Sequence, residues 1–187
     1  MSTVTHRSLV ELEAGIDEIR RSPKDQGPLE LIVCRSAENQ RETLERGVLD
    51  IDDGLVGDNW KVRPSTISED GLAHPDMQIN LTNVRAISLI AVERERWQLA
   101  GDQLYVDLDL SGDNLPPGTR LAIGSAIIEV TDQPHRGCAK FNERFGNAAL
   151  KFVNSPVGIE LNLRGINARV VKSGEIHPGD TVTKTKL

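Results

Sequence analysis

Residues 129–146 read EVTDQPHRGCAKFNERFG, and the organisation of the rest of the chain can be worked out from this stretch. It begins with a strand pattern, which Pro134 and Gly137 interrupt before Cys138. After the cysteine, apolar residues recur at the three- and four-residue spacing of a helix. The expected buried face of this helix consists of Phe141, Phe145, Phe152 and either Ala148 or Ala149. The stretch therefore predicts a strand that leads through a loop to Cys138 at the start of a helix.

Positive charge surrounds Cys138. In residues 135–144, Arg136, Lys140 and Arg144 carry fixed charges and His135 can add a titratable one. These ten residues contain a single acidic residue. Nearby cations and a helix N-terminus both lower the pKa of a thiol, so we predict a reactive thiolate at Cys138 near neutral pH. The alternative is that Cys138 is a small buried apolar residue, because free cysteines are usually buried.

Composition restricts the class of protein. The chain has 187 residues, 38% of them apolar and 27% charged, as expected for one globular domain. A net charge of −6 without a long basic stripe argues against nucleic acid or an anionic membrane as the main partner. No apolar run approaches the roughly 18 residues of a membrane span, and the N-terminus lacks a signal-peptide pattern. With only two cysteines, we expect a cytoplasmic protein with free thiols and with Cys34 in the core.

Hydrophobic patterns divide the chain into short strands and a few helices. Strands are expected over residues 29–34, 77–82, 103–110, 120–123, 126–131, 158–163, 166–172 and 181–184. Helices are expected over residues 8–21, 83–97 and after Cys138, and a functional loop over residues 65–76. Short strands joined by tight turns predict a mainly β fold with peripheral helices (α+β), in which the sheet curls or closes into a barrel.

Common catalytic motifs are absent from the sequence. It contains no dinucleotide fingerprint, P-loop, HExxH motif or paired CxxC. The spacing of His135 and Cys138 is a weak metal signal on its own. Two alternatives stay open at this point. One is a cysteine-based hydrolase or thiol transferase, in which Cys138 attacks and His74 or His177 acts as base. The other is a non-catalytic ligand-binding barrel with an inert cysteine.

Several short motifs occur in a characteristic order. They are GLVGD at residues 54–58, NLPPG at 114–118 followed by LAIG at 121–124, CAKF at 138–141, RGINARVV at 164–171, Gly174, and PGD at 178–180. In this order the chain resembles the MOSC domain, which is found at the C-terminus of molybdenum cofactor sulfurases and in stand-alone proteins. The resemblance runs from Leu29 to the end. It implies a helical extension over residues 1–28 and a MOSC-type β-barrel over residues 29–187.

The resemblance also implies a cofactor and a set of site residues. Cys138 matches the family cysteine, which carries sulfur or ligates the molybdenum of a bound molybdopterin, and a soft thiolate suits both roles. The remaining candidates for binding this cofactor are Arg136, Lys140, Arg164, Asp58 and His135. Two activities are implied: sulfur transfer, or molybdenum-dependent reduction of N-hydroxylated compounds. The chain lacks the pyridoxal-phosphate desulfurase domain of full sulfurases and an iron–sulfur ligand set, so an external sulfur or electron donor protein is expected.

Two features of the resemblance lead to specific expectations. Residues 72–77 read LAHPDM, so this loop lacks the glycines that many family members carry there. Arg136, Lys140 and Arg164 are expected to converge on the phosphate of the cofactor, because arginine donates two parallel hydrogen bonds to such a group. In that case Arg164→Ala should weaken phosphate binding and change thermal stability little. Alternatively, Arg164 pairs with an acid such as Glu160 and braces the barrel.

Overall fold

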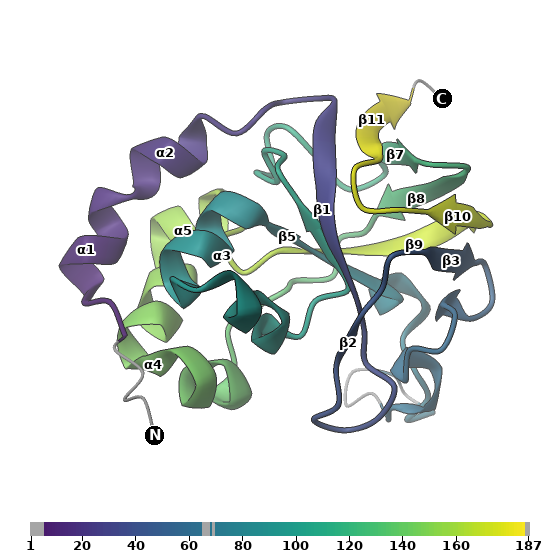
Figure 1. Ribbon diagram of the computed structural model, residues 1–187, viewed down its shortest axis with the longest axis horizontal. Coiled ribbons are helices and arrows are strands. Elements are labelled where there is room, and N and C mark those ends of the chain that lie inside the picture. Colours follow the sequence, from purple (N-terminus) through teal and green to yellow (C-terminus); the bar gives the residue numbers. More distant parts are fainter. Residues whose placement is uncertain (1–5, 65–67, 69, 186–187) are drawn as a thin grey trace.

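Seven strands close into a β-barrel in the computed structural model, which describes residues 6–64, 68 and 70–185 (Figure 1). In order around the barrel they are β11 (Thr181–Thr185), β7 (Arg120–Ile123), β8 (Ala126–Val130), β9 (Ile166–Lys172), β5 (Ile79–Asn83), β6 (Leu104–Val106) and β1 (Gly27–Cys34). Strand β1 pairs back onto β11 and closes the barrel. Neighbouring strands are antiparallel except β5 and β6, which are parallel. The predicted mainly β barrel is confirmed.

Further elements flank the barrel on two sides. A small sheet contains β10 (Gly174–Ile176), β3 (Gly47–Asp50) and β4 (Gly54–Leu55), and β2 (Glu42–Thr43) pairs antiparallel with the end of β1. The helices are α1 (Leu9–Ala14), α2 (Ile16–Arg20), α3 (Val84–Ala91), α4 (Ala139–Val153) and α5 (Pro156–Glu160). Figure 1 shows the helices on one side of the barrel and the small sheet on the other. Short 3-10 helices complete the described chain: η1 (Trp60–Val62), η2 (Pro75–Met77) and η3 (Arg94–Ala100).

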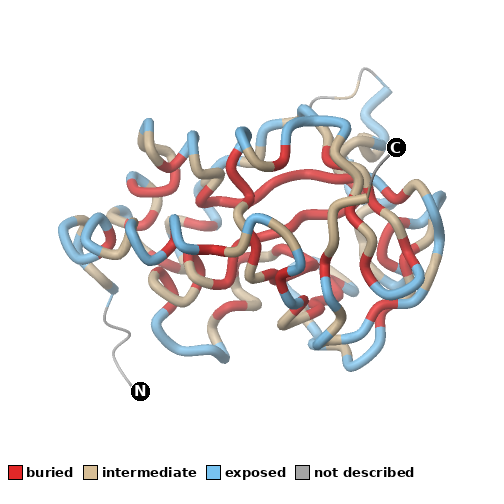
Figure 2. The backbone as a smooth tube through the Cα atoms, turned by 90° about the horizontal axis from the view of Figure 1, so that it is seen from above, coloured by how far each residue is buried: buried red, intermediate tan, exposed pale blue. Residues whose placement is uncertain are grey.

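The chain buries two apolar cores. One fills the barrel with inward-facing residues of its strands, such as Leu81, Leu121 and Ile128. The other lies between the helices and the outer surface of the barrel, where Phe145 of α4 and Leu12 of α1 are both buried. Buried segments accordingly run through the middle of the molecule, with exposed turns around them (Figure 2). The phenylalanine-bearing face that the sequence predicted for α4 is therefore the face that attaches this helix to the barrel.

Several expected elements occur where their local signals placed them. Ser8 and Glu11 form the predicted capping box, and the Asn83 side chain accepts hydrogen bonds from the first amides of α3. The hairpin β7–β8 turns at Gly124, whose positive φ of 54° suits glycine in a two-residue turn. The closing strands β9 and β11 also follow the prediction. These elements could be predicted because each has a strong signal within a few residues.

Other expectations were wrong. Residues 158–163 are not a strand: Ser155 caps and Pro156 begins the short helix α5, so helix-start chemistry outweighs the apparent alternation. The predicted helix 83–97 ends at Ala91, where Val92 has a positive φ of 66°, and η3 follows. The strand expected over 103–110 is limited to β6. The strand expected over 77–82 starts two residues later, as β5, because Met77 is the last residue of η2. The helix expected over 8–21 is split into α1 and α2 at Gly15.

The remaining sequence predictions have mixed outcomes. Part of the expected loop, residues 65–67 and 69, lies outside the described residues. The division into an extension over residues 1–28 and a MOSC domain over residues 29–187 stays a prediction. In the described part of the chain, no helix combines the length and apolar character needed to cross a bilayer.

Candidate functional site

A cavity of about 610 Å³ opens where the segment after β1, the end of η3 and the start of α4 meet. Its lining contains seven cationic side chains, which are Arg35, Arg41, Arg63, Arg136, Lys140, Arg144 and Arg164. Among the described residues that line it, Glu38 is the one acid. Cys138 also lines this cavity. The cavity is therefore strongly basic, although the chain as a whole carries a net charge of −6.

Cys138 is the N-cap residue of α4, as the sequence predicted. Its backbone is extended (φ −124°, ψ 179°), its carbonyl accepts the first helical hydrogen bond from Asn142, and its side chain makes no capping bond. The residue is exposed, so it is not the small buried residue of the alternative interpretation. The free amides at a helix N-terminus favour a negative charge, and Cys138 also interacts electrostatically with Arg63. Cys138 is therefore an accessible sulfur atom with positive charge nearby.

Cys34 occupies a contrasting environment. It is 5% exposed in the barrel core, as predicted. Burial raises the pKa of its thiol, and the nearby carboxylate of Asp58 raises the pKa further. The two cysteines therefore differ in both exposure and electrostatics.

Two buried carboxylates hold two of the arginines in the cavity wall. Asp58 accepts hydrogen bonds of 2.8 Å from both Nε and Nη2 of Arg35, and Arg35 Nη1 donates to Asn80 and to the carbonyl of Gly101. Asp58 does not line the cavity. It was predicted to bind a cofactor, but its side chain is fully buried beneath Arg35, which it orients. Asp58 is thus a positioning residue for Arg35.

The second carboxylate is Asp102, which sequence reasoning missed. Arg164 Nη1 donates to its two oxygens at 2.8 and 2.7 Å, Arg164 Nη2 donates to the carbonyl of Ala100, and His135 Nε2 lies 2.7 Å from Oδ1. Burial would raise the pKa of Asp102, but Arg164 and His135 outweigh it and lower the pKa to about 2. The acid partner of Arg164 is therefore Asp102, and the sequence-based suggestion of Glu160 was wrong.

His135 lies at the edge of this pair. Its side chain is 14% exposed. Burial lowers the pKa of the imidazole, and the charge of Arg164 lowers it further against the opposing effect of Asp102. His135 is therefore neutral at pH 7 and donates from Nε2 to Asp102, which leaves Nδ1 as an acceptor.

Two predicted cations lie nearer the surface. The side chain of Lys140 is exposed and pairs with Glu38 at 2.8 Å. Arg136 is also exposed, and its described hydrogen bond goes to the carbonyl of His135 at 3.4 Å. The structure thus brings the predicted Cys138, His135, Arg136, Lys140 and Arg164 to one cavity. The sequence did not single out Arg35, Arg41 or Arg63 for this cavity, because they come from segments without a local motif.

Several buried polar atoms in the cavity wall have no hydrogen-bond partner within the part of the chain that the structure describes. They are Arg41 Nε, Asn59 Oδ1, Trp60 Nε1 and Arg164 Nε. A buried polar atom without a partner costs free energy, typically about 1–3 kcal/mol. A polar ligand would supply partners for such atoms. The wall is therefore suited to a ligand with both hydrogen-bonding edges and negative charge.

Comparison with known proteins identifies the family. The sequence model of the MOSC domain matches residues 68–183, which is more than half of the chain. The chain belongs to the MOSC domain family. The YuaD protein from Bacillus subtilis has a similar fold, with a TM-score of 0.64 and 15% identity over 87% of this chain and 97% of that chain. YiiM from Escherichia coli has a TM-score of 0.56 and 20% identity, over 87% of this chain and 70% of that chain. No curated protein sequence matches significantly.

The MOSC family is associated with the molybdenum cofactor, so we asked whether the residues of this site fit that group. No cluster of three or more His, Cys, Asp or Glu that could hold a metal ion occurs among the described residues. A metal carried inside an organic cofactor does not require such a cluster, since a single soft ligand such as Cys138 can complete its coordination. The basic wall and its unpartnered polar atoms fit the anionic, hydrogen-bonding remainder of the cofactor.

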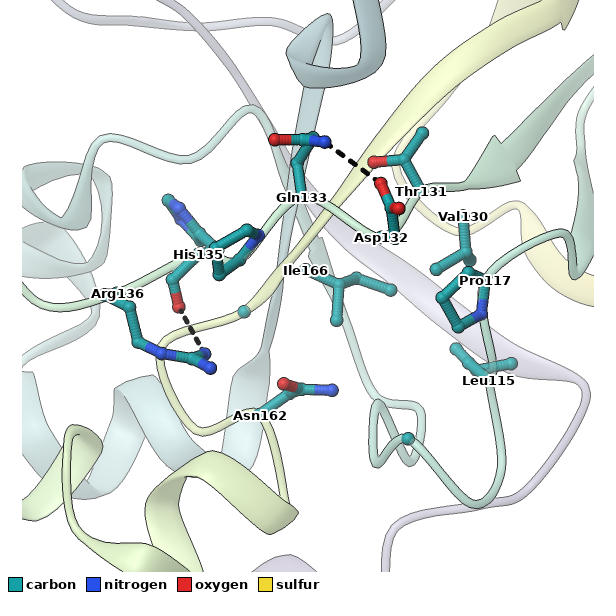
Figure 3. A pocket seen from close by; sticks show the side chains of 13 residues that line it. Leu115, Pro117, Val130, Thr131, Asp132, Gln133, His135, Arg136, Asn162 and Ile166 are labelled. Atoms are coloured by element: carbon teal, nitrogen blue, oxygen red, sulfur yellow. Dashed lines mark hydrogen bonds between the residues drawn. The ribbon is translucent and has the colours of Figure 1, made fainter. Parts of the chain in front are cut away.

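A second, smaller cavity of about 160 Å³ lies next to residues 130–136 of this MOSC chain. Figure 3 shows His135 and Arg136 at one end and Leu115 and Pro117 at the other. Gln133 donates to Asp132 at its rim. His135 and Arg136 line both cavities, so the segment that carries them separates the two. The position of this segment is therefore important for the shape of the larger site.

Proposed function

We propose that this MOSC protein binds the molybdenum cofactor in the basic cavity, with Cys138 as the ligand of its metal or as a carrier of sulfur. One observation supports the proposal most directly. An exposed cysteine at the N-terminus of α4 lies in the same cavity as seven cationic side chains. A soft thiolate suits both molybdenum and sulfur, and the cations suit a phosphate-bearing cofactor.

The residues of the chain would have different roles in such a complex. When bound, the molybdenum cofactor supplies two-electron redox chemistry. Cys138 would bind the metal or hold the sulfur, and the helix N-terminus would stabilise its negative charge. Asp58 and Asp102 balance the charges of Arg35 and Arg164 and hold both guanidinium groups in place, so these two residues would form a preorganised wall for the ligand.

Two activities agree with this arrangement: reduction of an N-hydroxylated compound, and transfer of sulfur from Cys138. We propose that a separate protein supplies the electrons or the sulfur. We also propose a cytoplasmic location, which the free thiols of Cys34 and Cys138 support, because a reducing compartment keeps both of them reduced.

The cysteine-hydrolase alternative has one observation in its favour, which is that His74 lines the cavity together with Cys138. Its Nδ1 accepts a hydrogen bond from the amide of Asp76 at 3.2 Å, so the neutral ring carries its proton on Nε2, and this hydrogen bond would have to break before His74 could act as a base. His177, the other base considered, belongs to the turn between β10 and β11 and does not line the cavity. His74 is therefore the base that this alternative would use.

Metal and pterin analysis of the purified protein tests the proposal. Protein from a molybdenum-replete host should contain molybdenum and a fluorescent pterin after oxidation. Cys138→Ser should lose most of the molybdenum, whereas Cys34→Ala serves as the matched cysteine control and should retain it. The absence of both molybdenum and pterin from wild type would contradict the proposal. Metal-free ester hydrolysis that is abolished by Cys138→Ser and by His74→Gln would favour the hydrolase instead.

A further inference from the structure

Arg41 and Arg144 approach each other above Gly101 in the wall of the larger cavity. Nη2 of Arg41 and Nη1 of Arg144 lie 3.6 and 3.7 Å from the point that a Cβ of residue 101 would occupy. Gly101 has a positive φ of 85° and no side chain, so no Cβ occupies the point that both guanidinium groups approach. Arg41 follows β1, whereas Arg144 belongs to α4. The fold therefore brings together two cations from distant parts of the sequence.

Neither of these arginines has an acidic partner among the described residues. By contrast, Arg35 pairs with Asp58, Arg164 with Asp102 and Lys140 with Glu38. Arg144 donates to the carbonyl of Leu99 at 2.9 Å and to Asn39 at 3.3 Å, which are neutral acceptors.

Both guanidinium groups are partly buried. Burial lowers the pKa of Arg41, and the charge of Arg144 lowers it further. Partly buried like charges without a counter-charge are unfavourable, and the buried Nε of Arg41 also lacks a hydrogen-bond partner. An anion between the two groups would offset their mutual repulsion.

We propose that Arg41 and Arg144, above Gly101, form a subsite for a phosphate monoester. Two guanidinium groups balance the charge of a phosphate dianion, and each can donate parallel hydrogen bonds to its oxygens. This subsite differs from the one expected from the sequence, because Arg164 and Lys140 are already paired with acids. If the phosphate is that of the bound cofactor, the assignment rests on the proposed function. The binding of free phosphate does not depend on the proposed function.

The positions of Cys138 and of this subsite also define the orientation of a ligand that contacts both. Cys138 and Arg144 are six positions apart at the start of α4, which corresponds to about 9 Å along a helix axis. Both residues precede Gly146, where the backbone leaves helical geometry with φ 84° and ψ 167°. A ligand that reaches both would contact Cys138 at one end and the two guanidinium groups above Gly101 at the other.

Titration calorimetry of the cofactor-free protein with inorganic phosphate tests the subsite. Wild type should bind one phosphate, and Arg41→Gln and Arg144→Gln should each weaken binding tenfold or more, equivalent to about 1.4 kcal/mol. Arg46→Gln is the matched control, because this substitution removes the same charge from an arginine that pairs with Glu175 at the surface. Its affinity for phosphate should equal that of wild type. Circular dichroism of each variant verifies folding, and the two subsite variants provide independent tests.

A second titration distinguishes free phosphate from a phosphorylated pterin. A 6-alkylpterin phosphate should bind wild type more tightly than the same pterin after phosphatase treatment, and Arg144→Gln should abolish this difference. The subsite is overturned if wild type does not bind phosphate, if both variants bind it like wild type, or if Arg46→Gln weakens binding equally. If phosphate binds as described but the purified protein never contains molybdenum or pterin, the proposed function fails and the subsite stands.

Discussion

Replacing Arg164 by methionine should destabilise the protein strongly, because the change leaves the carboxylate of Asp102 buried without its main partner. Asp102 is 0% exposed, and Arg164 is 7% exposed. Methionine retains apolar contact with the Phe141 ring, which lies 5.0 Å from the guanidinium carbon. The effect of the substitution is therefore mainly electrostatic.

Two routes give the magnitude. The pKa of Asp102 falls from its ordinary 3.8 to about 2, and at about 1.4 kcal/mol per pKa unit this is about 2–3 kcal/mol of stabilisation of the charged form. Removing one partner of a buried ion pair typically costs about 3–5 kcal/mol, since the remaining charge is unsatisfied. We expect the free energy of unfolding of Arg164→Met at pH 7 to fall by an amount in this range. This corrects the expectation from the sequence that loss of Arg164 changes thermal stability little.

Urea unfolding at several pH values measures the effect. In the variant only His135 still opposes the effect of burial, so the pKa of Asp102 is higher than in wild type, and the deficit in stability relative to wild type narrows as the pH falls from 7 towards 4. Arg169→Met is the control, because Arg169 is 48% exposed where it pairs with Asp76 and Glu129. It should cost less than about 1 kcal/mol. A deficit in Arg164→Met no larger than in this control, or one that does not change with pH, would refute the reasoning.

Three further predictions concern reactivity, pH and backbone geometry. Brief iodoacetamide treatment near neutral pH should label Cys138 faster than Cys34, because Cys138 is exposed whereas burial shields Cys34 and raises its pKa. Mass mapping would detect the difference, and equal rates would contradict it. The pKa of His135 is lower in the folded protein than its ordinary 6.5, so the unfolded chain takes up a proton on this side chain at a higher pH than the folded protein does. Thermal stability should therefore fall as the pH drops below about 6.5. His135→Gln should flatten this part of the melting profile. Gly165→Ala should lower the melting temperature, since φ is 117° and a Cβ would lie 2.2 Å from the carbonyl oxygen of Leu81; an unchanged value would contradict this geometry.

The parts of the fold that the sequence predicted correctly depend on local chemistry. The hairpin β7–β8, the strand β9 and the buried face of α4 each have a repeating pattern or a turn residue within a few positions. Residues 158–163 show the limit of this reasoning. Their alternating apolar residues were interpreted as a strand, while Ser155 and Pro156 just upstream already carried the start signal for α5.

The candidate site was predictable only in part, for a similar reason. Cys138 and its neighbours lie in one segment, so their shared charge was visible in the sequence. The partner of Arg164 is Asp102, which lies 62 positions away and becomes a neighbour only when β5, β6 and β9 assemble. Arg41 likewise comes from a polar segment without a motif. Its role depends on how that segment packs against α4, which periodicity does not specify.

The closing seam of the barrel has a consequence for how the protein reaches its native state. Strand β1 meets β11 through the pairs Gly27–Val182 and Pro28–Thr181, which join residues from nearly opposite ends of the chain. Contacts of such high sequence separation require the closure of a very long loop, and proteins that depend on them fold slowly. The hairpin β7–β8 needs only a tight turn at Gly124 and Ser125 and can form early. During synthesis on the ribosome, the barrel would therefore stay open, with the edge of β1 exposed to aggregation, until β11 has emerged.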